Sequence, residues 1–130
     1  MGVRPSLRAQ RRSEDLPTLR GPLIRLRPRL ATDQELSSWR QRVRNPNELV
    51  LLDLFCGAGG LSLGFHQAGF FVAAGLDQNI RAVETHAANF DARSKAVDLA
   101  TIGSSAESVR AFIDSELELP RVDVIVGGPP

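Results

Sequence analysis

The chain has 130 residues, enough for one small domain, and its 42% of hydrophobic and 24% of charged residues are ordinary for a globular protein. No apolar run is long enough to cross a bilayer, and the first twenty residues lack the apolar segment of a secretory signal. A single cysteine excludes an intrachain disulfide, and with two distant histidines it disfavours a structural zinc site. We therefore expect a cytoplasmic protein with no membrane segment and no metal.

The net charge of +1 conceals an uneven distribution. Residues 1–44 hold eleven arginines against four acidic residues, whereas residues 45–130 hold five basic against eleven acidic residues. Residues 1–31 also contain four prolines and no sustained hydrophobic period, so we expect a basic, mostly disordered arm. Three roles for this arm stay open: contacts with nucleic-acid phosphates, a mitochondrial transit peptide, and a solvated extension with no dedicated role.

Residues 32–45 predict a helix followed by a linker. Thr32 or Asp33 can cap this helix, arginines favour its C-terminal end, and Pro46 stops it. We expect Trp39 to dock the helix on the body of the protein, which residues 46–130 would form.

Beyond Pro46, short apolar segments alternate with segments of helical spacing. The segments that predict buried strands are 49–55, 70–76, 95–99 and 122–126. Helices are expected between them, with Ile80, Val83, Ala87 and Phe90 on the inner face of the second, and with a capping box of Ser104 and Glu107 on the third. This alternation predicts an α/β fold with a doubly wound parallel sheet in the order 3-2-1-4 and helices on both faces.

Three features follow the first three strands: a glycine loop at 57–60, Asp77, and Asp98 with Leu99. Open α/β sheets bind ligands at the carboxyl ends of their strands, so these features should meet there. The loop lets backbone approach a ligand, Asp77 can accept from ribose hydroxyls, and Asp98 can accept from an adenine amino group. Each has a structural alternative: a tight turn, an N-cap for the helix near Ile80, and a solvated strand end. Together they predict an adenosyl ligand.

The residues from 53 to 65, Asp-Leu-Phe-Cys-Gly-Ala-Gly-Gly-Leu-Ser-Leu-Gly-Phe, resemble the first signature motif of cytosine-5 DNA methyltransferases. Val-Asp-Val-Ile-Val-Gly-Gly-Pro-Pro at 122–130 is similar to the approach to their nucleophile motif, and residues 84–90 resemble the helix between. The resemblance covers residues 49–130. It implies that residues 46–130 are the truncated, N-terminal cofactor-binding part of a Rossmann-like fold that uses S-adenosyl-L-methionine.

The resemblance also implies a set of cofactor-binding residues, with Asp77 on the ribose and Asp98 on the adenine amino group. The full set is Phe55, Gly57, Ala58, Gly60, Asp77, Gln78, Asp98, Leu99, Gly128 and Pro130. Gln78 stands where many relatives place a large apolar residue that stacks on adenine. We therefore expect that stacking to shift to Leu99.

By the same resemblance, the catalytic cysteine of the family follows the position of Pro130. We therefore expect no catalytic residue in this sequence and no methyl transfer by this chain alone. Cys56, in the glycine loop, is expected to pack as a small apolar side chain rather than to act as a nucleophile. In the complete enzyme, a thiolate adds to C6 of a flipped cytosine so that C5 can accept the methyl group. DNA would be the partner, and the protein would be associated with the bacterial nucleoid.

Three other functions stay open or are disfavoured. A transfer-RNA cytosine-5 methyltransferase shares the same early motifs, so its fragment is an alternative. A non-catalytic adenosyl-binding subunit, paired with a second chain that carries the C-terminal motifs, is another. A dinucleotide-dependent oxidoreductase is disfavoured because the glycine spacing is not G-x-G-x-x-G.

Overall fold

The computed structural model describes residues 32–130, so the predicted basic arm at 1–31 lies outside the described residues. No helix in the described part of the chain is long and apolar enough to span a membrane. The elements in chain order are α2 (Asp33–Arg44), β1 (Val50–Leu54), α3 (Gly60–Gln67), β2 (Phe71–Asp77), α4 (Ile80–Asn89), β3 (Arg93–Ala96), the 3₁₀ turn η1 (Leu99–Thr101), α5 (Ala106–Glu116) and β4 (Val124–Gly127).

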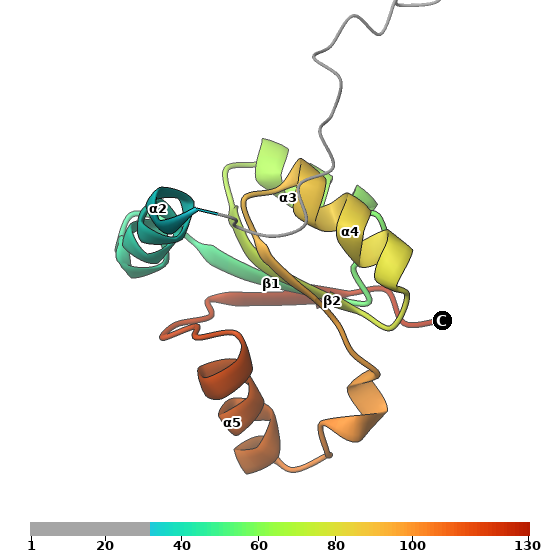
Figure 1. The fold of residues 1–130 in the computed structure, drawn as a ribbon. Coiled ribbons are helices and arrows are strands. Elements are labelled where there is room, and N and C mark those ends of the chain that lie inside the picture. Colours follow the sequence, from blue (N-terminus) through green and yellow to red (C-terminus); the bar gives the residue numbers. More distant parts are fainter. Residues whose placement is uncertain (1–31) are drawn as a thin grey trace, which may run out of the picture.

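The four strands form one parallel sheet in the order β3-β2-β1-β4, which confirms the predicted topology (Figure 1). The central strand β1 pairs with β2 from Val50 to Leu54 and with β4 from Leu51 to Leu54. Parallel neighbours need crossover connections, and helices supply them here. The chain is therefore an α/β domain whose strand carboxyl ends meet at one edge.

Helices cover both faces of the sheet, as predicted, and each face has its own apolar cluster. The larger cluster packs α2 and the end of α5 on one face, around Trp39, Leu52, Leu76 and Leu117. The smaller one packs α3 and α4 on the opposite face, around Phe90 and its neighbours. Figure 1 shows α3 and α4 on one side of β1 and β2, with α5 on the other. Strands buried on both faces explain why the sequence shows continuous apolar runs.

Helix α2 is capped and docked as the sequence indicates. Thr32 and Glu35 form a reciprocal capping box, in which the Thr32 hydroxyl accepts from the Glu35 N–H at 3.1 Å. Trp39 is buried, and its indole N–H donates to the carbonyl of Ala73 in β2 at 2.9 Å. An indole placed in this way combines a large apolar surface with a satisfied donor. Val43 of the same helix is fully buried in the same cluster, so α2 is fixed to the sheet by apolar packing and by the indole hydrogen bond.

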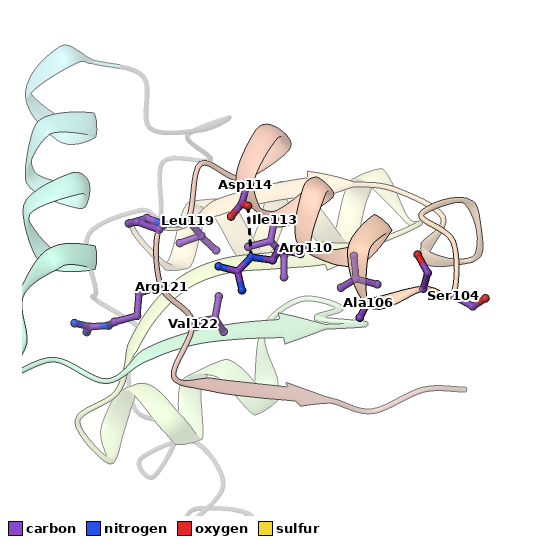
Figure 2. A pocket seen from close by; sticks show the side chains of 11 residues that line it. Ser104, Ala106, Arg110, Ile113, Asp114, Leu119, Arg121 and Val122 are labelled. Carbon is purple, nitrogen blue, oxygen red and sulfur yellow. Dashed lines mark ion pairs between the residues drawn. The ribbon is translucent and has the colours of Figure 1, made fainter.

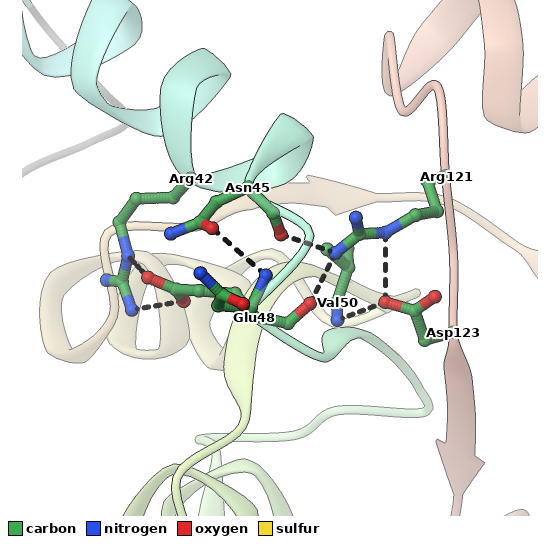
Figure 3. A network of polar contacts seen from close by, with 7 residues as sticks. Arg42, Asn45, Glu48, Val50, Arg121 and Asp123 are labelled. Carbon is green, nitrogen blue, oxygen red and sulfur yellow. Dashed lines mark hydrogen bonds and ion pairs between the residues drawn. The ribbon is translucent and has the colours of Figure 1, made fainter.

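A polar network ties the segment after α2 to the start of β4 (Figure 3). The Arg121 guanidinium donates to the carbonyls of Asn45, at 3.0 Å, and Glu48, and pairs with the Asp123 carboxylate at 3.0 Å. Asp123 in turn accepts from the N–H of Val50, the first residue of β1, at 2.8 Å. One arginine therefore satisfies carbonyls of the α2–β1 loop while its partner carboxylate aligns the amino ends of β1 and β4.

Three local predictions are wrong. Helix α5 is capped by Ser105, whose hydroxyl accepts from the Ser108 N–H, so the expected capping box at Ser104 does not form. Strand β3 spans Arg93–Ala96 rather than 95–99, because the chain turns into η1 there. Ile80 is 61% exposed although it was placed on the inner face of α4. It is the first residue of α4, whereas the buried residues of this helix, Val83 and His86, begin one turn later.

Candidate functional site

A cavity of about 460 Å³ lies where β1, β2 and β3 end. It is lined by Phe55, Asp77, Gln78, Asn79, Val97, Asp98, Leu99, Gly128 and Pro130. Seven of the ten predicted cofactor-binding residues are on this wall. The other three, Gly57, Ala58 and Gly60, lie in the adjoining loop after β1. The structure thus brings the predicted residues to one place, and their binding of a cofactor stays a prediction.

The loop after β1 turns through left-handed backbone conformations. Phe55 has φ +58°, Gly57 has φ +53°, and Gly59, which caps α3, has φ +106°. Such values favour glycine, and for the bulky Phe55 they cost conformational energy. The Cys56 N–H donates to the carbonyl of Leu76 at 2.9 Å, which anchors the loop to the end of β2. The loop is therefore held in a strained shape, with the Phe55 side chain 39% exposed on the cavity wall.

Asp77 is fixed by two backbone donors. Its Oδ2 accepts from the N–H of Gly57 at 3.0 Å, and its Oδ1 accepts from the N–H of Asn79 at 2.9 Å. The alternative in which Asp77 caps the next helix is wrong, because Asn79 caps α4 by accepting from Arg81 and Ala82. Each carboxylate oxygen has a second lone pair, so Asp77 can still accept from ligand hydroxyls. It therefore joins the glycine loop to the cavity.

Asp98, which follows β3, also lines the cavity and is exposed. Its Oδ1 accepts from the N–H of Ala100 at 3.0 Å and so caps the turn η1. Leu99 packs partly against the apolar cluster of that face. Gln78 is exposed beside them. A carboxylate, an amide and an apolar side chain thus face one cavity, which is a suitable lining for a nucleobase.

Cys56 belongs to the loop after β1, and its side chain is buried. Burial, followed by the nearby carboxylates of Asp53 and Asp77, raises the pKa of the thiol to about 12. A nucleophilic cysteine needs the opposite, a lowered pKa in electropositive surroundings. The structure therefore supports the packing role expected for Cys56.

Sequence reasoning missed a group of polar residues beneath the loop. Asp53 in β1, Ser62 in α3 and His86 in α4 are fully buried and hydrogen-bonded in series, and Ser94 in β3 completes the row. The available signal was Asp53 itself, a carboxylate in an otherwise apolar strand, because buried carboxylates need partners. These residues do not line the cavity.

A larger cavity, of about 700 Å³, runs along α5 toward β4 (Figure 2). Val109, Ile113, Leu119 and Val122 give it a mostly apolar wall, and its one ion pair is exposed. It gathers none of the predicted binding residues. Within residues 32–130, no three side chains form a cluster that could hold a metal ion. The smaller cavity therefore remains the candidate site.

Part of the chain resembles known proteins. The family model of C-5 cytosine-specific DNA methylases matches residues 49–130. Type II methyltransferase M.HgiDI of Herpetosiphon aurantiacus is 37% identical over 79 residues, which are 61% of this chain and 23% of the relative. M.HgiGI of the same organism is 35% identical over 79 residues, which are 61% of this chain and 56% of the relative.

A solved structure from E. coli, described as a candidate DNA modification methyltransferase encoded within a prophage, is 37% identical, with a TM-score of 0.53. The match covers 64% of this chain and 23% of that one. The chain thus spans between 23% and 56% of the length of these relatives. Because the family model matches more than half of the residues, the chain belongs to the C-5 cytosine-specific DNA methylase family and corresponds to its N-terminal part.

Proposed function

We propose that the cavity at the ends of β1, β2 and β3 binds S-adenosyl-L-methionine, as the cofactor site of a DNA cytosine-5 methyltransferase. One observation carries the proposal. Residues from separate strand ends, Phe55, Asp77 and Asp98, line a single cavity of about 460 Å³, a size that suits a small-molecule ligand. Family membership supplies the reaction class.

Each wall of the cavity has a distinct role in this proposal. Asp77 accepts from the ribose hydroxyls while its bond to Gly57 keeps the loop in place. Asp98 accepts from the adenine amino group, with Leu99 beside the ring. Gly128 and Pro130 lie at the end that carries the methyl group, and the bound cofactor supplies that group to the cytosine. The cofactor part thus orients the donor and needs other residues for the chemistry.

We further propose that this chain alone transfers no methyl group. C6 of cytosine must be attacked by a nucleophile before C5 becomes reactive, and the single thiol, Cys56, is buried with a raised pKa. The nucleophile would come from the region that follows Pro130 in the family, within the same polypeptide or on a second chain. DNA is the proposed substrate and the bacterial nucleoid the proposed location, with transfer RNA as the alternative substrate.

Calorimetry with S-adenosylhomocysteine, which resembles the cofactor, tests the cofactor site. Asp98→Asn is the sharper variant, because asparagine can still cap η1 while it presents a donor to the adenine amino group. We expect Asp98→Asn and Asp77→Asn each to weaken binding by about 1–3 kcal/mol, the scale of hydrogen bonds to a charged group. Asp91→Asn, at an exposed position outside the cavity, should bind like the wild type. Wild-type protein that binds no S-adenosylhomocysteine, or binds NAD equally well, would refute the assignment.

Methyl transfer from labelled cofactor to DNA and to transfer RNA tests the catalytic part. We expect no transfer by residues 1–130 alone, and transfer after addition of a second polypeptide from a relative that begins with its catalytic Cys-Gln segment. Transfer to only one of the two nucleic acids would identify the substrate. If residues 1–130 were active alone and Cys56→Ser abolished that activity, both the inactivity and the role of Cys56 would be wrong.

A further inference from the structure

The buried polar residues beneath the glycine loop form one continuous hydrogen-bond chain across four elements. Asp53 Oδ2 lies 2.5 Å from the hydroxyl of Ser62, which lies 2.9 Å from His86 Nε2. On the far side of the imidazole, His86 Nδ1 lies 2.6 Å from the hydroxyl of Ser94. Burying polar groups is costly unless they are hydrogen-bonded; among the described residues, Ser62 and both nitrogens of His86 have partners, whereas Asp53 Oδ1 has none. The residues do not line the cavity, so their position needs another explanation.

The donors in this chain can be assigned. The Ser62 hydroxyl donates to Asp53 Oδ2 at 2.5 Å, a short distance for a hydroxyl–carboxyl hydrogen bond. With its only proton used, Ser62 must accept from His86, which therefore carries its proton on Nε2. Burial lowers the pKa of His86 to about 4, so the imidazole is neutral at about pH 7 and Nδ1 accepts from the Ser94 hydroxyl. Every bond then runs in one direction, from Ser94 through His86 and Ser62 to Asp53.

The imidazole of His86 packs directly against the backbone of two glycines. A Cβ added at Gly75 in β2 would lie 2.5 Å from its Cε1, and one added at Gly59 would lie 3.2 Å from its Cδ2. The ring of Phe90, whose centroid is 4.8 Å from that of His86, would meet the same Gly59 Cβ at 2.5 Å. His86 and Phe90 therefore form the surface on which the end of the glycine loop rests.

The loop is thus held from both sides. On the cavity side, Asp77 accepts from the N–H of Gly57. On the buried side, the rings of His86 and Phe90 leave no room for a Cβ at Gly59, and Ser62 ties the first turn of α3 to β1. Gly59, beside the imidazole, lies two residues after Gly57, whose N–H donates to Asp77.

We propose that His86 and Ser62 are positioning residues for the cofactor cavity, because the directed chain from Ser94 to Asp53 fixes the ring that supports the glycine loop. The inference rests on the proposed cofactor function. A positioning role differs from a purely structural one. If the role were purely structural, any substitution that lowered the stability of the fold by the same amount would weaken cofactor binding equally.

The tautomer can be measured first, in the complete 130-residue chain without ligand. Two-bond ¹H–¹⁵N correlation spectra distinguish the nitrogens of a neutral imidazole, and exposed His66 serves as the internal reference. We expect His86 to be neutral at about pH 7 with its proton on Nε2. A proton on Nδ1, or an imidazolium, would overturn the directed chain whatever the protein binds.

The positioning role is tested by variants matched for stability. Ser62→Ala removes the central link, and Val83→Ala truncates another buried side chain of α4 without touching the hydrogen-bond chain. At equal folded fractions, we expect Ser62→Ala to raise the Kd for S-adenosylhomocysteine about tenfold above that of Val83→Ala, which corresponds to about 1.4 kcal/mol. Equal Kd values would overturn the proposal.

Ser94 offers a second test if Ser62→Ala does not fold, because Ser94 is only partly buried at the start of β3. Ser94→Ala removes the donor to Nδ1, whereas Ser94→Thr keeps it and suits a strand. We expect the threonine variant to retain the wild-type tautomer and Kd and the alanine variant to lose both. Identical behaviour of the two variants would overturn the proposal. Wild-type protein with the expected tautomer but no binding would instead refute the cofactor function, and the positioning role with it.

Discussion

Acidification should destabilise this domain through a single histidine. Burial lowers the pKa of His86 to about 4 in the folded protein, from an ordinary value of 6.5. The unfolded chain therefore binds a proton at a higher pH than the folded protein does, and stability falls as the pH decreases through this interval. At about 1.4 kcal/mol per pH unit, the full effect is roughly 3 kcal/mol, of which about 2 kcal/mol is lost between about pH 7 and pH 5.

Asp53 acts in the opposite direction. Burial raises its pKa, although its bonds to Ser62 lower it in part, so the folded protein takes up this proton at a higher pH than the unfolded chain. Asp53 therefore contributes stability as the pH falls through its own folded pKa and below. It offsets part of the loss caused by His86 at the acidic end of the range.

Urea unfolding of the 130-residue chain at about pH 7 and pH 5 measures the effect. We expect His86→Gln to be less stable at neutral pH and to lose about 2 kcal/mol less than the wild type on acidification. His66→Gln, which changes an exposed histidine of the neighbouring helix, should keep the wild-type pH dependence. If His86→Gln and the wild type lost the same free energy between the two pH values, the reasoning from burial would be refuted.

Three further predictions concern the loop and the sheet edge. Gly59→Ala should lower the free energy of unfolding by at least about 2 kcal/mol, because φ is +106° and the new Cβ would collide with Phe90. Gly64→Ala, at a helix position with open space around it, should raise that free energy by about 0.5–1 kcal/mol, and thermal melts of the two variants would measure both changes. Cys56 should react with iodoacetamide far more slowly in folded protein than in urea, and equal rates would contradict its burial. Ile125→Lys should reduce concentration-dependent self-association in sedimentation, because Ile125 is 55% exposed on edge strand β4; a monomeric wild type would argue against this.

The sequence predicted the architecture because its strongest patterns are local. Continuous apolar runs and the glycines between them determine which segments become strands, and alternation with helices leaves few possible topologies. The docking role of Trp39 was predictable because a large indole on a short amphipathic helix is best buried against the neighbouring sheet. The gathering of Asp77 and Asp98 at one cavity also follows from topology, since carboxyl ends of parallel strands share an edge.

What the sequence could not predict depends on contacts between distant segments. Asp77 and Asn79 are both able to cap a helix. Because β2 extends to Asp77 and α4 begins at Ile80, Asn79 occupies the capping position. Ile80 and His86 both fit the helical pattern of α4, but in the structure His86 is buried and Ile80 is exposed. The imidazole of His86 is buried because Gly75, in strand β2, has no side chain and leaves room for it. No periodicity in α4 contains that information.

The position of β4 beside β1 has a consequence for the timing of folding. During synthesis, β1 can pair with β2 as soon as both have emerged, but its other edge stays open until β4, about 70 residues later, is made. At typical rates of elongation, that interval lasts roughly 4–14 seconds. The Arg121 network that aligns β1 with β4 also forms only then. The nascent domain therefore leaves one edge of its central strand unpaired until β4 is made, and the speed of translation through residues 97–123 becomes a determinant of its yield.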